Sequence, residues 1–358
     1  MVQNTRTETE AYVIESKGAP AVLKTIPLAP LKDDEVEIDM KFCGLCHTDC
    51  HMQNNDWGIT TYPLVAGHEG TGIVAAVGRN VTNLKAGDHV GVGWIRNSCK
   101  SCRQCIQGKD NLCEHVYQGV FLGKNAGNWG RQGCELQGCF AKIMHIDARF
   151  AFKIPETVDL AKVAPLLCAG ITVWEPIIDY ITPGSKVGVV SLGGLGHMAV
   201  KLAKAVGAEV TVLSSSDGKH MQALDLGAHH YYNYSNKETL KDVKLDVIID
   251  TCPVANNLEL FLSLLHAGGT YVRVGIPSGA TAKFEYNWIS LVFNGQKIVG
   301  SIVSGSKNTN KLIQVAANNN ILSDVTEVPF SKINETMKGL LEGSLDTTKA
   351  FRYVLKWD

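Results

Sequence analysis

Two short segments of this sequence carry residue types that bind zinc. The first reads Cys46-His47-Thr48-Asp49-Cys50-His51, and the second reads Gly67-His68-Glu69. A cysteine sulfur, a histidine nitrogen and an acidic oxygen are ligands that Zn²⁺ binds in tetrahedral sites. The predicted ligands are Cys46, His68, Glu69 and Cys168.

Cys168 completes this set because its neighbours, Pro165-Leu166-Leu167 and Ala169-Gly170, are mostly apolar and would shield a metal. The residue also lies where a second domain should begin. We therefore expect one metal shared between two domains, with a coordination position left for substrate.

Four further cysteines follow the spacing Cys99-x2-Cys102-x2-Cys105-x7-Cys113. Four thiolates close a tetrahedron and leave no position for a reactant, which is typical of a structural zinc. Two disulfides and an iron–sulfur cluster are the alternatives, because their cysteine spacing can be similar. Lys100, Arg103 and Lys109 would offset part of the negative charge of the thiolates.

Composition narrows the class of protein. The chain has 358 residues, enough for two domains, and is 45% hydrophobic and 19% charged, as in ordinary globular proteins. With 34 basic and 35 acidic residues it has no charge excess that would attract nucleic acid or an anionic membrane. The sequence shows neither a secretory signal nor an apolar run of membrane-spanning length. We expect a cytoplasmic protein whose 11 cysteines are reduced.

The first half of the chain reads as mostly β. Residues 11–42 alternate apolar and polar positions between turns, and strand patterns recur at 71–77 and 88–93. The glycine-rich segment 119–138 is interpreted as a surface loop.

From Leu160 onward the pattern becomes apolar strands alternating with amphipathic helices. A strand over 186–190 runs into Ser191-Leu192-Gly193-Gly194-Leu195-Gly196, a helix over 197–206 and a strand over 209–213. This is a βαβ unit with the glycine turn of a dinucleotide site. Later strands are predicted at 245–250, 269–275, 297–302 and 350–356, the last returning to the first domain, and helices at 308–319 and 332–342.

The residue that ends the second strand bears on which cofactor binds. Proteins that bind NAD usually have Asp or Glu there, and this chain has Ser214, followed by Ser215, Ser216, Asp217 and Lys219. Hydroxyl donors and an ammonium can bind the 2′-phosphate of NADP(H), which a carboxylate would repel. The sequence therefore favours NADP(H) over NAD(H), although Asp217 opposes this interpretation. A serine-rich turn without a ligand is the other interpretation.

Together these motifs resemble the zinc-containing medium-chain alcohol dehydrogenases, and within them the branch of cinnamyl alcohol dehydrogenases and microbial NADPH-dependent aldehyde reductases. The likeness covers nearly the whole chain. It implies an α/β fold with two domains: a GroES-like, mostly β catalytic domain over residues 1–168 and 303–358, and a doubly wound parallel-sheet (Rossmann) NADP-binding domain over 169–302.

The resemblance also implies roles for single residues. Cys46, His68 and Cys168 would be fixed zinc ligands, with Glu69 a mobile fourth ligand, and Asp49 would orient His68. Thr48 would pass a proton through the cofactor ribose to His51, assisted by Asp56. The residues implied to contact the dinucleotide are Thr48, Thr172, Ser191, Leu192, Gly193, Gly194, Leu195, Gly196, Ser214, Ser215, Ser216, Lys219, Thr251, Gly275, Ser301 and Ile302. Ser191 departs from the family, which usually has glycine there.

We expect a zinc enzyme with two Zn²⁺ per chain that reduces aldehydes to primary alcohols with NADPH, reversibly. Trp57 and Trp94 could line its substrate pocket, whereas Trp174, Tyr180 and Trp288 are interpreted as packing residues. The resemblance and the strand near 297–302 suggest a homodimer.

Several alternatives stay open. The enzyme could be a cinnamyl alcohol dehydrogenase in the strict sense or an NAD-dependent primary alcohol dehydrogenase. A non-catalytic zinc scaffold and an NADPH sensor are the non-enzymatic alternatives. His47 and His51 could be additional zinc ligands, or His51 could be a surface residue.

Overall fold

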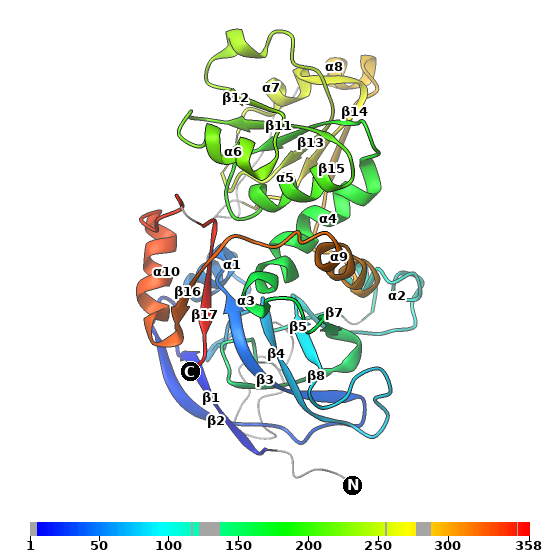
Figure 1. Ribbon diagram of the computed structural model, residues 1–358. Coiled ribbons are helices and arrows are strands. Elements are labelled where there is room, and N and C mark those ends of the chain that lie inside the picture. Colours follow the sequence, from blue (N-terminus) through cyan, green and yellow to red (C-terminus); the bar gives the residue numbers. More distant parts are fainter. Residues whose placement is uncertain (1–5, 116, 122–136, 255, 277–287, 349) are drawn as a thin grey trace. The chain divides into compact units, whose positions relative to one another are not determined.

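The computed structural model describes residues 6–115, 117–121, 137–254, 256–276, 288–348 and 350–358. The chain divides into two compact units, which we describe separately (Figure 1). Unit 1 contains residues 1–168 and 304–358, and unit 2 contains residues 169–303.

Unit 1 is built on a seven-stranded sheet with the order β16-β17-β3-β4-β5-β9, in which β8 also pairs with β3. The pairs are antiparallel except β16–β17. The strands are β3 (Glu35–Gly44), β4 (Gly70–Val77), β5 (His89–Val92), β8 (Ile143–Asp147), β9 (Ala151–Lys153), β16 (Val325–Pro329) and β17 (Arg352–Lys356). Two smaller ribbons pair β1 (Glu8–Ile14) with β2 (Ala21–Pro27) and β6 (Ile95–Ser98) with β7 (Tyr117–Gly119).

The central strand β3 carries the segments that matter for the site. Its apolar residues Val36, Ile38 and Met40 are buried, so the sheet has a continuous core behind it. At its carboxyl end, Cys43 lies opposite Leu355 of β17, which brings the end of the chain beside the first zinc-type segment. The C-terminal strand therefore joins the first domain, as the sequence pattern predicts.

The helices of unit 1 are short and lie around this sheet. They are α1 (His47–Asn54), α2 (Arg103–Ile106), α3 (Leu160–Val163), α9 (Ser306–Asn318) and α10 (Ile333–Glu342), with 3₁₀ helices η1 (Asp110–Leu112), η2 (Ala148–Phe150), η3 (Ala164–Leu167) and η5 (Phe330–Lys332).

Unit 2 is a six-stranded, fully parallel sheet with the order β12-β11-β10-β13-β14-β15. The strands are β10 (Lys186–Val190), β11 (Glu209–Ser214), β12 (His230–Asn233), β13 (Leu245–Asp250), β14 (Leu265–Arg273) and β15 (Lys297–Gly300). The helices are α4 (Ala169–Tyr180), α5 (Gly196–Ala205), α6 (His220–Leu226), α7 (Leu258–Ser263) and α8 (Trp288–Phe293), with η4 (Lys237–Leu240).

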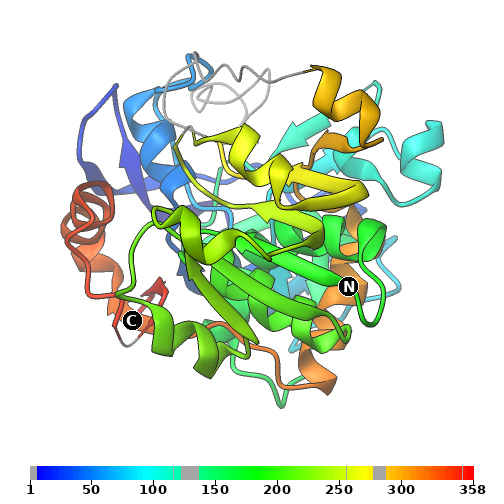
Figure 2. The same ribbon diagram turned by 90° about the horizontal axis from the view of Figure 1, so that it is seen from above.

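The strand order of unit 2 reverses beside β10. The chain moves outward from β10 to β12 and then returns to β13 on the other side. Right-handed crossovers in opposite directions place α5 and α6 on one face of the sheet and α7 and α8 on the other (Figures 1 and 2). This is the doubly wound arrangement that the sequence predicts, and its switch point lies between β10 and β13.

Most predicted elements are found within one to four residues of their expected bounds. The strands at 186–190 and 245–250 are found without change, and the helix predicted at 308–319 begins two residues earlier, at Ser306. Strand β12 was not predicted, because its sequence His-Tyr-Tyr-Asn is polar and only half buried. Most of the predicted 119–138 loop lies outside the described residues.

Among the described residues no single helix is long and apolar enough to cross a membrane. Residues 160–167 and 169–180 meet that test only as a bent pair. The ten described cysteines are all free thiols, which argues against the disulfide alternative for the four-cysteine segment.

Candidate active site and metal centres

The four predicted ligands of the first metal site gather in unit 1. One ligand atom from each of Cys46, His68, Glu69 and Cys168 lies within 4.8 Å of all the others, and all four residues are buried. Nε2 of His68 lies 3.2 Å from Sγ of Cys168, which joins two segments far apart in the sequence. Because Cys168 ends unit 1, the expectation that the ligands are shared between two domains is wrong.

Asp49 holds the first two zinc-type segments together. Its Oδ2 accepts the N–H of Cys46 at 3.0 Å, which begins helix α1. Its Oδ1 accepts the N–H of Gly67 at 2.9 Å and lies 3.1 Å from Nδ1 of His68. With Nδ1 held by this buried carboxylate, Nε2 of His68 faces the two thiols and is available to a metal.

The backbone around His68 leaves room only for glycine. Gly67 has φ of +89°, and a Cβ there would lie 2.6 Å from the ring of Phe140. Trp94 and Phe121 meet the His68 ring edge-on, with centroids 5.3 and 5.8 Å away. These aromatic contacts fix the plane of the imidazole and place Trp94 beside a predicted ligand.

Glu69 has a partner that sequence reasoning missed. Nη2 of Arg352, in β17, lies 2.6 Å from Oε2 of Glu69 and donates to the carbonyl of Leu45 at 3.1 Å. Burial raises the pKa of Glu69 to about 7, and the neighbouring guanidinium opposes that rise. Gly44 makes this contact possible, because a Cβ at that position would lie 2.0 Å from Oε2 of Glu69.

The donor set fits zinc. A hydrogen bond between the two thiols lowers the pKa of Cys46 and raises that of Cys168. Cys46 therefore carries a thiolate readily, and a bound cation would compensate the charge of both sulfurs. Two sulfurs, one imidazole nitrogen and a carboxylate oxygen, all buried, match the chemistry of Zn²⁺.

The residues expected to move a proton lie on and after α1. Thr48 is half buried in the first turn of the helix, and His51 is buried one turn later. Nδ1 of His51 lies 2.7 Å from Oδ2 of Asp56, and its ring lies 5.0 Å from that of Trp57. The ligand cluster found among the described residues includes neither His51 nor His47. His51 is buried and contacts Asp56, so it is not an isolated surface residue. Trp57, predicted for the substrate pocket, has its ring against that of His51.

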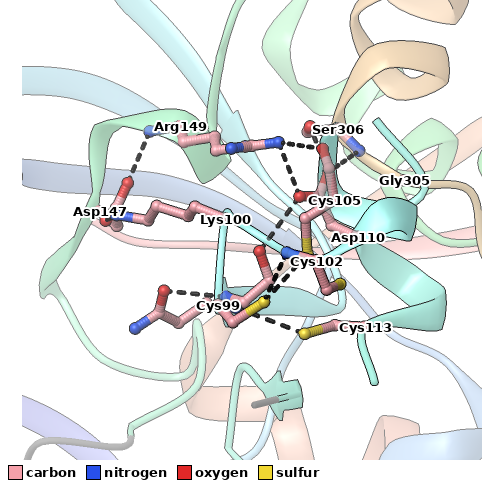
Figure 3. Close-up of polar contacts among 12 residues, drawn as sticks. Cys99, Lys100, Cys102, Cys105, Asp110, Cys113, Asp147, Arg149, Gly305 and Ser306 are labelled. Atoms are coloured by element: carbon pink, nitrogen blue, oxygen red, sulfur yellow. Dashed lines mark hydrogen bonds and ion pairs between the residues drawn. The ribbon is translucent and has the colours of Figure 1, made fainter. Parts of the chain in front are cut away.

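The four cysteines of the second site also gather (Figure 3). Sulfur atoms of Cys99, Cys102, Cys105 and Cys113 lie within 4.8 Å of one another. The N–H groups of Cys99 and Cys102 point at Sγ of Cys113 and of Cys99, at 3.4 and 3.3 Å. Backbone hydrogen bonds, first from Ser101, lower the pKa of Cys99 to about 6. Four sulfurs with backbone donors fit a structural zinc that admits no substrate.

Asp110, inside the four-cysteine segment, connects it to helix α9 (Figure 3). Asp110 is fully buried and accepts from the Ser98 hydroxyl at 3.1 Å and from the N–H of Ser306 at 3.0 Å. Arg149 pairs with Asp110 at 2.9 Å and donates to the carbonyl of Cys105. Because α9 begins after Gly305, which has no side chain, Asp110 supplies the cap of this helix from a distant segment.

The charges around this site differ from expectation. Lys100, predicted to offset the thiolates, pairs with Asp147. Arg149 instead reaches the segment and donates to a backbone carbonyl there.

In unit 2 the glycine turn lies between β10 and α5. Ser191 takes φ of +73°, the conformation that favours glycine and that costs other residues about 1 kcal/mol. Gly196 has no room for a side chain, since a Cβ would lie 2.1 Å from the Ser191 carbonyl. By contrast, a Cβ on Gly193 would meet no described atom within 4 Å, so the turn leaves open space where a pyrophosphate could approach the backbone.

The other predicted cofactor residues follow the carboxyl ends of the parallel strands, which share one edge of the sheet. Ser214 ends β11, Thr251 follows β13, and Ser301 follows β15. The Ser301 hydroxyl is buried without a hydrogen-bond partner among the described residues, as expected for a group that meets a ligand. The remaining positions at this edge are Leu192, Gly194, Leu195, Ser215, Ser216, Gly275 and Ile302, whereas Thr172 lies buried in α4.

Comparison with known proteins assigns this arrangement. The sequence matches the family models "Alcohol dehydrogenase GroES-like domain" over residues 32–156 and "Zinc-binding dehydrogenase" over residues 194–318. It is 39% identical to a mannitol dehydrogenase of Apium graveolens over 90% of this chain and 86% of that protein. The chain belongs to the zinc-containing medium-chain alcohol dehydrogenases.

Other relatives of this dehydrogenase are named cinnamyl alcohol dehydrogenases. Cinnamyl alcohol dehydrogenase 7 of Arabidopsis thaliana is 36% identical over 97% of this chain and 96% of its own. A solved cinnamyl alcohol dehydrogenase of Sorghum bicolor is 34% identical with a TM-score of 0.88, covering 98% and 97%. The enzyme of Helicobacter pylori, solved with NADP(H), is 31% identical with a TM-score of 0.88, covering 98% and 99%. The resemblance inferred from the motifs and the predicted fold class are thus confirmed.

Lys219 and Thr251, two predicted cofactor residues, both contact the glycine turn of this dehydrogenase. Nζ of Lys219 donates to the carbonyl of Leu192 at 2.8 Å, and burial lowers the pKa of Lys219. Its ammonium therefore lies against the glycine turn. The Thr251 hydroxyl donates to the carbonyls of Val190 and Ser191 at 2.8 and 3.2 Å, which fixes the same turn from the β13 side.

Asp250, which sequence reasoning missed, fixes the end of β13. This fully buried carboxylate accepts from the N–H of Cys252 at 2.9 Å, the Asn256 amide at 2.6 Å, Arg273 at 2.6 Å and the Tyr271 hydroxyl. A charged last residue in an otherwise apolar strand is the sequence signal that could have indicated such a network.

Removing the Arg352 guanidinium should destabilise the dehydrogenase. In Arg352→Gln, Glu69 would be a buried carboxylate without its cation, and we expect a loss of about 3 kcal/mol in the free energy of unfolding at pH 8. The loss should be smaller at pH 6, because the folded-state pKa of Glu69 is raised and protonation then removes the charge. Urea unfolding at both pH values measures this.

The matched control is the double variant Glu69→Gln/Arg352→Gln. It removes both charges of this pair and should regain most of the lost stability. An equal loss at both pH values, or no recovery in the double variant, would contradict the role of this pair.

Proposed function

We propose that this enzyme reduces aldehydes to primary alcohols with NADPH, reversibly, and that it binds two Zn²⁺ per chain. The observation that carries the proposal is the buried cluster of Cys46, His68, Glu69 and Cys168, beside helix α1, which begins directly after Cys46 and carries Thr48 and His51. Family membership supports aldehyde–alcohol oxidoreduction as the reaction class. The set is too specialised for a scaffold or a sensor, because neither needs a proton path beside a metal.

Cys46, His68 and Cys168 would hold the catalytic metal, with Glu69 as an exchangeable fourth ligand. Zinc bound there supplies a Lewis acid that polarises a carbonyl oxygen and lowers the pKa of an alcohol. Glu69 can leave the metal without becoming an unpaired buried charge, because Arg352 already contacts its carboxylate. Cys99, Cys102, Cys105 and Cys113 would hold the structural zinc.

Thr48 and His51 would move the proton. The Thr48 hydroxyl can both accept and donate, so it can pass a proton onward, through the cofactor ribose, to His51. Asp56 accepts from Nδ1–H of His51 at 2.7 Å, which leaves Nε2 of the imidazole to take up the proton and release it to solvent. The contact with Trp57 holds the ring in this orientation.

NADPH is favoured as the hydride donor over NADH. Ser214, at the end of β11, lacks the carboxylate that binds the ribose hydroxyls of NAD, and Ser215 and Ser216 after it are exposed. The Helicobacter pylori relative was solved with NADP(H). An NAD-dependent primary alcohol dehydrogenase stays the alternative.

Trp94 would form one wall of the substrate pocket. Its ring lies 5.3 Å from that of His68, so a substrate bound to the metal would meet an aromatic surface. This favours planar or apolar aldehydes and keeps a cinnamyl alcohol dehydrogenase in the strict sense as the second candidate. The many free thiols, including both clusters, suit a reducing compartment such as the cytoplasm.

Removing the Thr48 hydroxyl should abolish most turnover. Thr48→Val keeps the shape but cannot transfer a proton, so we expect kcat to fall by about 100-fold or more, whereas Thr48→Ser should keep activity. NADPH oxidation with aliphatic, cinnamyl and benzyl aldehydes measures both the activity and the substrate preference. More than a tenth of wild-type kcat in Thr48→Val would count against the relay.

A carboxylate at position 214 should reverse cofactor preference. Ser214→Asp places a negative charge where the 2′-phosphate would bind, and we expect the ratio of kcat/KM for NADPH over NADH to fall at least about tenfold. Ser214→Asn, similar in size and uncharged, is the control and should fall much less. An unchanged ratio in Ser214→Asp would refute the cofactor assignment.

We also propose a homodimer formed through the β15 edge of unit 2. Strand β15 ends the sheet order and has one paired edge among the described residues, and the neighbouring α8 exposes Val292 (71%) and Phe293 (87%). Trp288, interpreted from sequence as a packing residue, is instead 65% exposed on the same helix. An open strand edge beside an apolar helix is typical of a surface that pairs with a second copy.

A charge on this helix should break the dimer. We expect Phe293→Asp to sediment as a monomer in analytical ultracentrifugation, because the interface would have to bury a carboxylate. Ile106→Asp, at an apolar residue of α2 in unit 1 that is 75% exposed, is the control and should remain dimeric. A dimeric Phe293→Asp would place the interface elsewhere.

A further inference from the structure

The serine-rich loop that follows β11 is fixed by a row of residues on the neighbouring edge strand. Tyr231 and Asn233 are alternate positions of β12, so their side chains share one face, and Ser235 lies in the turn just beyond the strand. Asn233 lies opposite Ser214 in the strand register. None of these three residues belongs to a recognised cofactor motif.

Each residue of the row binds a different group of the loop. The Tyr231 hydroxyl donates to the carbonyl of Ser216 at 2.5 Å, and the Ser235 hydroxyl donates to the carbonyl of Ser215 at 3.2 Å. Nδ2 of Asn233 donates to Oδ2 of Asp217 at 3.1 Å. Two backbone carbonyls and the carboxylate of the loop thus accept hydrogen bonds from β12 or from the turn just beyond it.

The orientation of the Asn233 amide is determined by a second contact. Its Oδ1 accepts the N–H of Ser235 at 3.0 Å, so Nδ2 must be the atom that faces Asp217. The amide therefore offers Asp217 a donor, and the carboxylate has a partner on the β12 side of the loop.

Two basic side chains near this loop have contacts of their own. Nζ of Lys219 binds the carbonyl of Leu192 at 2.8 Å, and the ring of His220 stacks on that of Tyr231 with centroids 4.9 Å apart. Asn233 is the side chain that the structure shows in contact with the Asp217 carboxylate.

We propose that Asn233 is a specificity-determining residue that admits the 2′-phosphate of NADPH by holding the Asp217 carboxylate against β12. The inference rests on the proposed preference for NADPH. A carboxylate free to turn toward Ser215 and Ser216 would repel a phosphate dianion there, much as an acidic residue at the end of the second strand does. Asn233 thus acts through Asp217 and is a positioning residue.

The test uses two fragments of the cofactor, 2′,5′-ADP and 5′-AMP, which differ by the 2′-phosphate. Their binding to the full-length enzyme is measured by isothermal titration calorimetry. In Asn233→Ala we expect the dissociation constant of 2′,5′-ADP to rise about fivefold, as for a like charge brought near in water, and that of 5′-AMP to stay unchanged. Added salt should reduce the difference, because the effect is a repulsion between charges.

Two controls separate this role from a structural one. Ser235→Ala removes another contact of the same row without freeing a charge, and should leave the ratio of the two dissociation constants unchanged. Asp217→Asn removes the carboxylate, and the double variant Asn233→Ala/Asp217→Asn should then bind 2′,5′-ADP as tightly as Asp217→Asn alone.

A ratio that is unchanged in Asn233→Ala, an equal loss for both fragments, or a loss that persists in the double variant would overturn the inference. A wild-type enzyme that binds 5′-AMP as tightly as 2′,5′-ADP would instead refute the preference for NADPH. The two failures are therefore distinguishable in the same titrations.

Discussion

The concentration of ionisable groups around His68 is the constraint on which the rest of unit 1 depends. Two thiols and a carboxylate lie buried within 4.8 Å of the imidazole, and each of them becomes an anion when it binds a metal. Buried anions need cations or hydrogen bonds, and the chain supplies Arg352 from its last strand. The return of β17 to the side of β3 is therefore an electrostatic requirement of the site as well as a packing solution. Gly44 and Gly67, where side chains would collide with Glu69 and Phe140, show how closely the backbone surrounds it.

Three buried carboxylates hold segments of the chain together by accepting hydrogen bonds. Asp49 connects α1 with the His68 segment, Asp110 connects the four-cysteine segment with α9, and Asp250 connects β13 with β14 and the loop that follows. Each is fully buried and accepts at least three hydrogen bonds, so its desolvation is compensated by charge-assisted contacts. Such a carboxylate is more than a local cap, because its donors come from segments far apart in the chain. Both predicted metal loops and the cofactor edge thus depend on buried carboxylates that are not themselves among the predicted ligands.

The sequence predicted what depends on local pattern. Spacing identified the four-cysteine cluster, because its members share one short segment, whereas Cys168 was assigned to the first cluster from its apolar neighbours and its place near the domain boundary. The βαβ unit followed from an apolar strand, a glycine turn and a helix. Contacts between distant segments were not predictable in this way. Arg352 lies 283 residues from Glu69, and no local rule assigns a partner at that distance. Strand β12 was not predicted because its sequence is polar, although pairing with a parallel strand stabilises it as the edge of the sheet.

At the cofactor edge, residue types alone predict cofactor preference less well than the hydrogen bonds that hold those residues in place. The segment Ser214-Ser215-Ser216-Asp217 carries three hydroxyls and one carboxylate, and nothing in the sequence alone discounts the carboxylate. In the folded chain the two kinds of group are not equivalent. Ser215, Ser216 and Asp217 are all exposed, but the Asp217 carboxylate has a donor on the neighbouring strand. Whether a charged side chain repels a ligand depends on where that side chain is held. Here the position of the Asp217 carboxylate is set by Asn233, 16 residues later in the chain.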